Sequence, residues 1–432
     1  MVSGSRRSAR FAVLAGLGLV LAPIPARAAG FALFEEGARG MGFAGAYTAQ
    51  AADPSAIFHN AAGIAFLKGK QIYIGGTLIN PATDFTGDAP FPGAGQLETM
   101  NVGVTPIPAV YYTHQLSESF VAGIGLDTPF GLKTEWDSPQ TFTGRFLSQK
   151  AELKGFSLNP TVAFKLADRL SLGVGLDVRF SSVTLDRNVP LVNPFTQKVV
   201  DVASVELKSD TATDFGWNLG VLAKPTENLS IGVSYRRSVK QDYAGTADFN
   251  RIPTGNAQLD TLVAVKVPAG PLPAATFIEY PSILSLGVAY SWKDWTVEGD
   301  VNFYGWSSFA SLPITIQGRP DLSAVVTEDF QDSRQYRIGL ERQLNDAWAV
   351  RGGYFHDESP SPPESVSPLL PDANRNGFCA GASWKQGHLR LDGSVWYVHL
   401  SDRSTEGVQR DSYNGTYSGH ALTLGLALGY SF

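Results

Sequence analysis

Two short patterns contain residue types that enzymes use for chemistry. Residues 399–401 (HLS) place a histidine two positions before a serine, and a histidine base activates a serine hydroxyl in many hydrolases. No acid or amide can be assigned to orient this histidine, and the spacing is common by chance. Residues 40–45 (GMGFAG) match the phosphate-binding pattern G-x-G-x-x-G, but no strand precedes them and no βαβ unit surrounds them. We therefore predict no catalytic residues and no cofactor, and we expect these glycines to allow close packing.

A polar segment that begins at Asp372 contains possible ligands for a cation. Asp372, Asn374 and Asn376 repeat the first half of a calcium-binding loop, in which carboxylate and amide oxygens coordinate the ion. The twelfth position of such a loop requires a glutamate, and this chain has Ser383 there. The one cysteine, Cys379, allows neither an internal disulfide nor a cysteine-rich metal site. We predict a polar turn here and no metal site.

Three aromatic residues, Phe31, Phe34 and Phe58, could line a pocket for an apolar ligand, because such pockets are mostly lined by apolar and aromatic side chains. They lie in residues 29–69, a stretch of small, apolar and nearly uncharged residues. The same three rings could instead form the core of that stretch. Both interpretations stay open.

The start of the chain has the pattern of a secretory signal peptide. Arg6, Arg7 and Arg10 form a positively charged region, residues 11–22 form an apolar core, and residues 26–28 (ARA) form a cleavage site. We predict that residues 1–28 are removed and that the mature chain begins near Ala29. No later apolar run reaches the ~20 residues that a membrane-spanning helix needs.

The composition argues against an ordinary soluble enzyme. Charged residues make up 17% of the chain, against about 25% in typical soluble domains. The 34 basic and 40 acidic residues give a net charge of −6, so the chain has no cationic surface for a nucleic-acid partner.

From residue 70 onward the sequence alternates between apolar and small or polar residues. Such alternation predicts strands with one apolar face, and strands of about 9–11 residues tilted by about 45° cross a bilayer. Strands of soluble sandwiches are shorter and carry more charge on their polar face. We count fourteen predicted strands: 71–80, 105–116, 120–128, 155–166, 169–182, 213–224, 229–240, 277–292, 295–306, 334–344, 347–356, 376–386, 388–400 and 419–432.

The connections between these strands alternate strictly between short and long. Only a closed barrel satisfies every backbone group in lipid, and outer-membrane barrels join their strands by short periplasmic turns and long extracellular loops. We therefore predict an all-β protein, with a 14-stranded antiparallel transmembrane β-barrel at 70–432 in a bacterial outer membrane and both termini in the periplasm. Residues 29–69 are too many for a simple tether, and such an apolar segment would be poorly solvated outside the lumen, so we expect them to fold inside it as a plug, or hatch. The terminal Phe432 looks like the signal read by the barrel-assembly machinery, although it could simply end an aromatic girdle.

Four stretches of the chain follow the pattern of a known family. They are the mature start at residues 29–31 (AGF), residues 144–178 (GRFLSQKAELKGFSLNPTVAFKLADRLSLGVGLDV), residues 336–360 (YRIGLERQLNDAWAVRGGYFHDESP) and residues 369–378 (LLPDANRNGF). In these stretches the chain resembles the FadL family of outer-membrane transporters. It implies a fourteen-strand barrel closed by an N-terminal hatch. The family's Asn-Pro-Ala hatch motif corresponds to Asn60, Ala61 and Ala62, so this chain lacks the proline; Asn60 could act in the hatch motif or simply cap a turn.

The resemblance also implies two functional features. By register, Arg187 falls where the family places an arginine that meets the ligand carboxylate, although it could be a solvated residue of the lumen or a loop. The assisting lysine of the family would fall near Pro313, where this chain has no cation. A lateral opening is implied where the third strand kinks inward, and Pro129, Phe130 and Gly131 suit such a break.

We therefore expect passive outer-membrane uptake of hydrophobic compounds, most of all long-chain fatty acids. The ligand would enter an apolar pocket, the hatch would rearrange, and the ligand would leave sideways through the kinked third strand into outer-membrane lipid. Uptake of aromatic hydrocarbons is the alternative within the family, and a general diffusion porin or an adhesin barrel is the alternative outside it.

Overall fold

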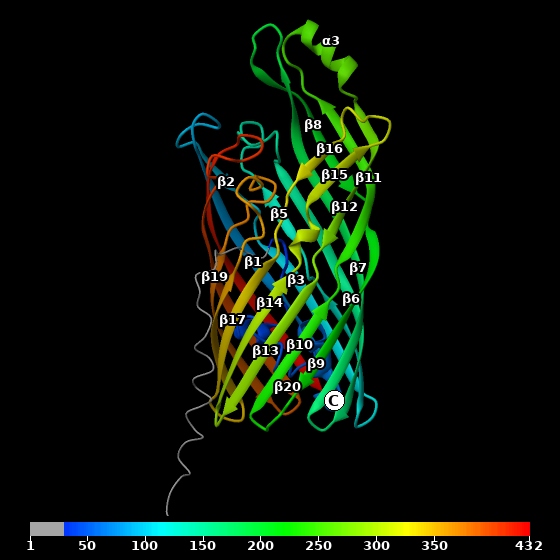
Figure 1. The fold of residues 1–432 in the computed structure, drawn as a ribbon, viewed down its shortest axis with the longest axis vertical. Helices are drawn as coiled ribbons and strands as arrows, with labels where there is room; N and C mark the ends of the chain where they lie inside the picture. The colour runs from blue at the N-terminus through cyan, green and yellow to red at the C-terminus, as the bar shows by residue number, and fades with distance from the viewer. Residues whose placement is uncertain (1–29) are drawn as a thin grey trace, which may run out of the picture.

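The computed structural model describes residues 30–432, so the predicted signal peptide and the start at Ala29 lie outside the described residues. The described chain is a closed antiparallel β-barrel around a filled lumen (Figure 1). The ring is closed by a continuous antiparallel ladder between its first and last strands, from Gln71 opposite Ser431 to Gly87 opposite Gly415. A ladder without an open edge satisfies the backbone groups that lipid cannot.

Fourteen strands form this ring, as the alternating pattern predicts. In chain order they are β1 (Lys70–Gly87), β3 (Thr105–Gln115), β4 (Phe120–Asp127), β6 (Lys150–Ala167), β7 (Leu170–Val192), β9 (Ala212–Ala223), β10 (Leu229–Arg236), β13 (Ile283–Trp292), β14 (Trp295–Tyr304), β17 (Ser333–Gln343), β18 (Trp348–Asp357), β19 (Arg375–Gln386), β20 (Leu389–Ser404) and β21 (Gly415–Ser431).

The connections predicted to be long are long in the structure, and most of them contain strands of their own. These are β2 (Leu97–Met100), β5 (Leu132–Glu135), β8 (Val199–Ser209), β11 (Val239–Arg251), β12 (Gly270–Tyr280), β15 (Ser311–Ile316) and β16 (Ala324–Thr327), with the helix α3 (Ala257–Lys266) and the short 3-10 helix η2 (Trp306–Ser308). They continue the wall of the barrel beyond the ring at one end, which we call the extended end (Figure 1).

Two predicted strands are wrong, because each is divided in the structure. The predicted strand 277–292 is split between β12 and β13 at Pro281, which has no N–H for a ladder hydrogen bond. The predicted strand 229–240 ends as β10 at Arg236, and its last residues begin β11.

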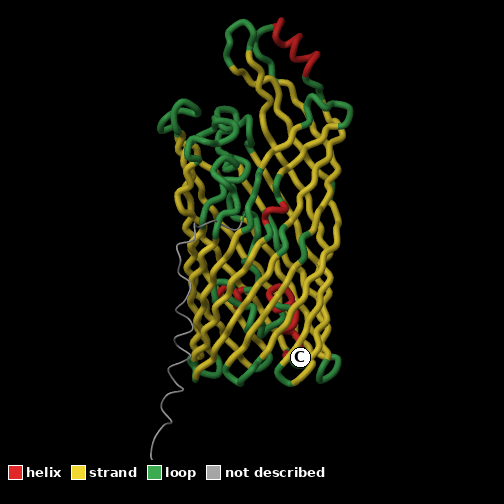
Figure 2. Tube along the Cα trace, viewed as in Figure 1, coloured by secondary structure: helices red, strands yellow, loops and turns green. Residues whose placement is uncertain are grey.

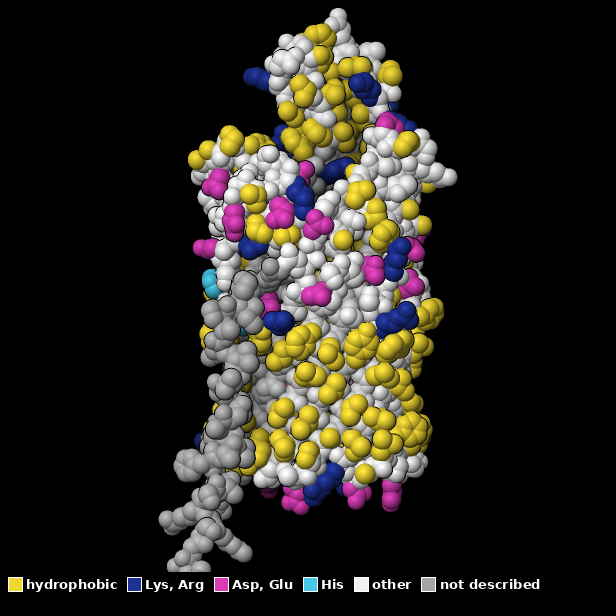
Figure 3. All heavy atoms as spheres, viewed as in Figure 1, with side chains coloured by type: hydrophobic (Ala, Val, Ile, Leu, Met, Phe, Trp, Pro, Cys, Tyr) yellow, Lys and Arg dark blue, Asp and Glu magenta, His cyan; other side chains and the backbone are white. Residues whose placement is uncertain are grey.

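The two faces of the wall differ as the alternation requires. On β21, Leu426 is 61% exposed on the outside, whereas its neighbour in sequence, Ala427, is 7% exposed on the opposite face. On the face that Figure 3 shows, apolar side chains gather over the lower half of the barrel, and charged side chains lie mainly above and below them. Among the described residues, no helix is long and apolar enough to span a bilayer.

Residues 30–69 fill the lumen near the end with the short turns, which we call the short-turn end. This hatch contains the helices α1 (Ala38–Gly42) and α2 (Ala56–His59) and the 3-10 helix η1 (Ala61–Phe66), seen in red inside the barrel in Figure 2. Helix α1 packs on β19, β20 and β21, and η1 packs on β6, β7 and β9. The chain leaves the hatch at Gly69 and enters β1 directly.

Candidate ligand-binding cavities

The third strand of the ring, β4, ends early and leaves a break in the wall. Its neighbour β6 continues upward and pairs next with β5, which begins only at Leu132. On the other side, the ladder between β3 and β4 stops where Val110 lies opposite Leu126. Residues 128–131 therefore leave the wall, and we call them the wall break. The predicted kink residues Pro129, Phe130 and Gly131 lie in this segment.

The hatch replaces the missing wall ladder of these residues. The Leu33 N–H donates to the Pro129 carbonyl at 3.0 Å, and the Gly131 N–H donates to the Phe31 carbonyl at 3.1 Å. Ala32 and Phe130 lie opposite each other in this short antiparallel bridge. The start of the hatch and the wall break therefore form one hydrogen-bonded unit.

A lateral cavity of about 800 Å³ lies at the wall break. Val104 and Phe156, which line it from its two flanks, are also 57% and 43% exposed on the barrel surface, so the cavity opens sideways. Its lining is mainly apolar and includes Leu33, Ile79, Pro81, Val102, Pro106, Ile107, Pro108, Leu126, Leu132, Leu153 and Phe180. The charged residues among its lining are Lys133, Glu152 and Lys154.

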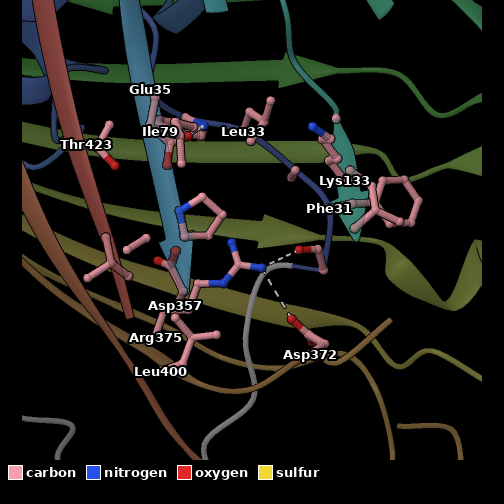
Figure 4. A pocket seen from close by; sticks show the side chains of 18 of the residues that line it. Phe31, Leu33, Glu35, Ile79, Lys133, Asp357, Asp372, Arg375, Leu400 and Thr423 are labelled. Carbon is pink, nitrogen blue, oxygen red and sulfur yellow. Dashed lines mark hydrogen bonds and ion pairs between the residues drawn. The ribbon is translucent and has the colours of Figure 1, made fainter. Parts of the chain in front are cut away.

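A central cavity of about 200 Å³ lies inside the barrel next to the lateral one (Figure 4). Hatch residues 30–35 form one side of it. The rest is formed by residues from β1, β2, the wall break, β5, β17 to β21 and the link between β18 and β19. The two cavities share six lining residues: Leu33, Ile79, Pro81, Gly131, Leu132 and Lys133. These residues lie between the two cavities, and Leu33 is the one that the hatch contributes.

Phe31 is held in a cluster of aromatic rings above the central cavity. Its ring lies 4.7 Å from Trp306, 5.3 Å from Phe309 and 6.1 Å from Tyr280, in edge-to-face arrangements that aromatic pairs prefer. Phe31 also lines a narrow apolar cavity of about 30 Å³ that leads toward the extended end. That cavity shares Leu132 and Leu370 with the central cavity, so apolar lining continues from one to the other.

Two arginines that line the central cavity, the buried Arg337 and the partly exposed Arg375, already have partners. Arg375 donates to the Gly30 carbonyl at 2.6 Å and pairs with Asp372 at 3.4 Å, as the dashed lines in Figure 4 show. Arg337 donates to the Ala44 carbonyl at 2.6 Å and pairs with Asp357 at 3.4 Å. Their charges are therefore balanced within the protein. Burial raises the pKa of Asp372 in spite of Arg375.

Lys133 lies between the two cavities. Its Nζ donates to the Val102 carbonyl at 2.7 Å, its one hydrogen-bond partner among the described residues. Nothing in the sequence around Lys133 distinguishes it from other lysines of the chain, and neither Lys133 nor Leu33 is among the residues that we predict from the sequence.

The predicted ligand-binding residues occupy different places. Phe31 and Phe34 line the central cavity, and Phe58 stands behind Phe34 with its ring 5.5 Å away. Asn60 accepts a hydrogen bond from the Ala62 N–H at the start of η1 and donates to Thr48 and Val221 carbonyls. The residues of the hatch motif, Asn60, Ala61 and Ala62, line neither cavity.

Arg187 also lies outside both cavities, on the upper part of β7 where it is opposite Val205. Its Nε is buried without a hydrogen-bond partner among the described residues. Burial lowers the pKa of Arg187, and the charge of Asp411 acts in the opposite direction. The role of Arg187 in binding a carboxylate stays a prediction.

A buried glutamate ties the hatch to the wall break. The Glu36 carboxylate accepts hydrogen bonds from the Thr128 N–H at 2.7 Å and from the Tyr111 hydroxyl at 3.1 Å. Burial raises the pKa of Glu36 well above its usual value, and the nearby Asp127 carboxylate raises it further. Burial in the folded protein therefore favours the neutral form of Glu36, although its two hydrogen bonds act in the opposite direction.

The lower part of the hatch is held by wall carboxylates. Asp300 on β14 accepts from the Tyr47 and Thr48 N–H groups at 2.9 and 3.0 Å. Arg39 of the hatch lies 3.7 Å from Glu341 on β17, which also pairs with Arg351 on β18 at 2.5 Å. The hatch is thus bonded to the wall in two places: at the wall break through residues 31–36, and at β14 and β17 through residues 39–48.

The side chains of the polar segment that resembles half of a calcium loop form hydrogen bonds with other protein groups. Asp372 accepts from the Ser359 hydroxyl at 2.6 Å, Asn374 accepts from the Ser359 N–H at 3.0 Å, and Asn376 accepts from the Tyr354 hydroxyl at 2.7 Å. Within residues 30–432, no group of three or more His, Cys, Asp or Glu side chains is placed to hold a metal ion.

Comparison with known proteins identifies relatives over almost the whole chain. The family model described as outer membrane protein transport protein (OMPP1/FadL/TodX) matches residues 19–432. The chain is 24% identical to the long-chain fatty acid transport protein of Salmonella typhi, over 94% of each chain. It is 26% identical to outer membrane protein P1 of Haemophilus influenzae, over 96% of this chain and 97% of the relative.

Solved structures show the same fold. A FadL homologue of Pseudomonas aeruginosa superposes with a TM-score of 0.81 at 19% identity, covering 94% of this chain and all of the other. The toluene transporter TodX of P. putida superposes with a TM-score of 0.74 at 18% identity, covering 93% of this chain and 99% of the other.

Proposed function

Because the chain belongs to the OMPP1/FadL/TodX family of outer membrane transport proteins, and is therefore an outer-membrane transporter of hydrophobic compounds rather than an enzyme, we propose that it takes up long-chain fatty acids passively. The observation that carries this proposal is the lateral cavity at the wall break, which shares its inner lining with the central cavity. A ligand that passes from one to the other reaches the lipid without crossing the hatch.

The apolar lining favours ligands with long hydrocarbon tails. Burying a sixteen-carbon tail is worth roughly 10 kcal/mol before binding costs, at ~0.8 kcal/mol per methylene. A ligand held this strongly leaves slowly unless the site changes. We propose that the hatch rearranges, that Leu33 withdraws from between the cavities, and that the ligand diffuses sideways into outer-membrane lipid.

Aromatic hydrocarbons are the second candidate substrates. The structural neighbours include the toluene transporter of P. putida, and the small central cavity with Phe31, Phe34 and Phe355 in its lining suits a ring compound. A general diffusion porin fits less well, because the hatch fills the lumen that hydrophilic solutes would need.

One assay separates these functions. Purified protein in detergent is offered labelled oleate and labelled toluene, with heat-denatured protein as the control. Fatty-acid uptake predicts saturable oleate binding, and hydrocarbon uptake predicts saturable toluene binding without oleate binding. Binding of neither would contradict the transporter proposal, and sugar-dependent swelling of liposomes that contain the protein would favour a porin.

Two sequence predictions belong to this proposal. Arg187 would meet the ligand on its way in from the extended end, and an unchanged oleate affinity after Arg187→Ala would remove that role. Phe432, which is 68% exposed at the end of β21, would be read by the barrel-assembly machinery. Deleting Phe432 should lower the amount of folded protein in the outer membrane, and unchanged amounts would contradict this.

A further inference from the structure

Lys133 differs from every other cation that lines the two cavities. The lining contains Arg337, Arg375, Lys133 and Lys154. Arg337 and Arg375 pair with Asp357 and Asp372, and Lys154, whose side chain is 70% exposed, pairs with Glu152 at 2.8 Å. Among the described lining residues, Lys133 is therefore the cation without a carboxylate partner.

The strand pairing explains why Lys133 is left unpaired. Glu152 lies directly opposite Lys133 in the ladder between β5 and β6, where opposite charges usually pair. The Glu152 carboxylate instead forms an ion pair with Lys154, which lies two residues further along the same strand. The Lys133 ammonium is thus left with a single backbone acceptor, although it carries three donors.

Lys133 also lies at the junction of the two cavities. It lies two residues beyond the wall break and lines both cavities, on the opposite side of the central cavity from Thr423 in Figure 4. A ligand that moves from the central cavity to the lateral cavity has to pass it. The surrounding lining is mainly apolar, and a charge-assisted hydrogen bond is stronger in such surroundings than in water.

We propose that Lys133 binds the carboxylate of the transported ligand at the junction of the two cavities and makes the protein prefer fatty acids over uncharged hydrophobic compounds. This inference rests on the proposed function. It assigns the head-group contact to a residue at the exit, whereas Arg187 lies outside both cavities. The tail would then lie along the apolar lining on either side of the junction.

The test compares an acid and an alcohol with the same tail. Equilibrium binding of labelled oleate and oleyl alcohol is measured at pH 8 for the wild type and for Lys133→Met, Lys133→Arg and Lys198→Met. Methionine keeps the length of the side chain without the charge, and Arg restores the charge. Lys198 is an exposed lysine in the link between β7 and β8, so its substitution controls for the loss of a positive charge.

We expect Lys133→Met to weaken oleate binding about tenfold or more, the range of a charge-assisted hydrogen bond, and to leave oleyl alcohol binding within about twofold. Lys133→Arg should retain most of the oleate affinity, and Lys198→Met should leave the affinity for both ligands unchanged. Folding of each variant is checked by the change in gel mobility between unheated and boiled samples.

Two negative results have different meanings. If the wild type binds neither ligand, the proposed function fails and this inference fails with it. If the wild type binds both and Lys133→Met weakens both equally or neither, the role of Lys133 is overturned while hydrophobic transport stands.

Discussion

Leu33 of the hatch donates its N–H to the carbonyl of Pro129 in the wall break at 3.0 Å, so the plug is hydrogen-bonded to the wall where the wall is open. The Leu33 side chain also stands between the central and lateral cavities. A movement of the hatch at this residue therefore changes two things together: it breaks the bridge to the wall, and it removes a side chain that lies between the cavities. This coupling is the basis of the transport mechanism proposed above.

The buried Glu36 should make the contact between hatch and wall break sensitive to pH. Because its pKa is raised in the folded protein, the neutral form is favoured there, and its contribution to stability falls as the pH rises from the unfolded pKa toward the folded one. Glu36→Gln keeps an acceptor for the Thr128 N–H without the charge. We expect the gain in thermal stability from this substitution to be larger at pH 8 than at pH 5, measured as the temperature at which the heat-resistant gel band is lost. An equal gain at both pH values would contradict the assignment.

Glu341 should be a major anchor of the lower hatch. Its replacement by alanine leaves Arg351, whose side chain is 1% exposed, without its closest carboxylate, and also removes a partner of Arg39. Breaking a buried ion pair in this way costs about 3–5 kcal/mol. We expect a clearly lower midpoint of urea unfolding for Glu341→Ala. Asp321→Ala is the matched control, since it breaks a pair with Arg319 in the exposed link between β15 and β16 and should leave the midpoint unchanged.

The wall glycine Gly220 should be needed to seat the hatch. A Cβ at this position on β9 would collide with the Asn60 side chain and the Ala62 N–H, and overpacking of this kind costs about 1–3 kcal/mol. We expect Gly220→Ala to loosen the hatch and to raise the ionic conductance of the protein in planar bilayers. Gly299→Ala on β14, where the nearest atom to an added Cβ is 3.8 Å away, should behave as the wild type. Equal conductance in both variants would show that the hatch does not depend on this contact.

The sequence could predict the ring because lipid and lumen impose opposite requirements on alternate residues. Leu424 and Leu426 face outward and Thr423 faces inward for this reason, and the pattern repeats in every strand of the ring. The strands of the extended end alternate with the opposite polarity, because water rather than lipid lies outside them. On β11, Tyr243 and Phe249 are buried while Lys240 and Asp242 are exposed, so a search for strands with an apolar outer face passes over this strand. The sequence shows a proline at position 281, but the residues on both sides of it alternate, so the two strands are predicted as one.

The candidate site could be predicted only in part. Phe31 and Phe34 stand out as aromatic residues in a segment of small ones. Leu33 and Lys133 become significant only when the hatch folds back onto the wall break, a contact between segments about a hundred residues apart. Lys133 has no carboxylate partner because Glu152 pairs with Lys154 although Lys133 lies opposite it on the neighbouring strand. No sequence pattern indicates which of the two lysines Glu152 pairs with.

A disulfide between the hatch and the wall break tests the central claim that these two must separate. Ala32 and Phe130 are a pair of an antiparallel bridge whose hydrogen bonds lie on either side of it, a geometry with a Cα separation of about 4.5 Å that suits a disulfide. The natural Cys379 is partly buried on β19, and its thiol donates to the Gly42 carbonyl at 3.2 Å, so it competes little for either new cysteine.

The most direct measurement is the rate of oleate uptake by cells that carry the Ala32→Cys/Phe130→Cys protein, before and after reduction, with each single cysteine variant as a control for the loss of the Phe130 ring. We predict that uptake is blocked while the disulfide is intact and returns on reduction to the rate of the Phe130→Cys variant. Uptake at that same rate with the disulfide fully formed would contradict the account, because the ligand would then cross without the hatch leaving the wall.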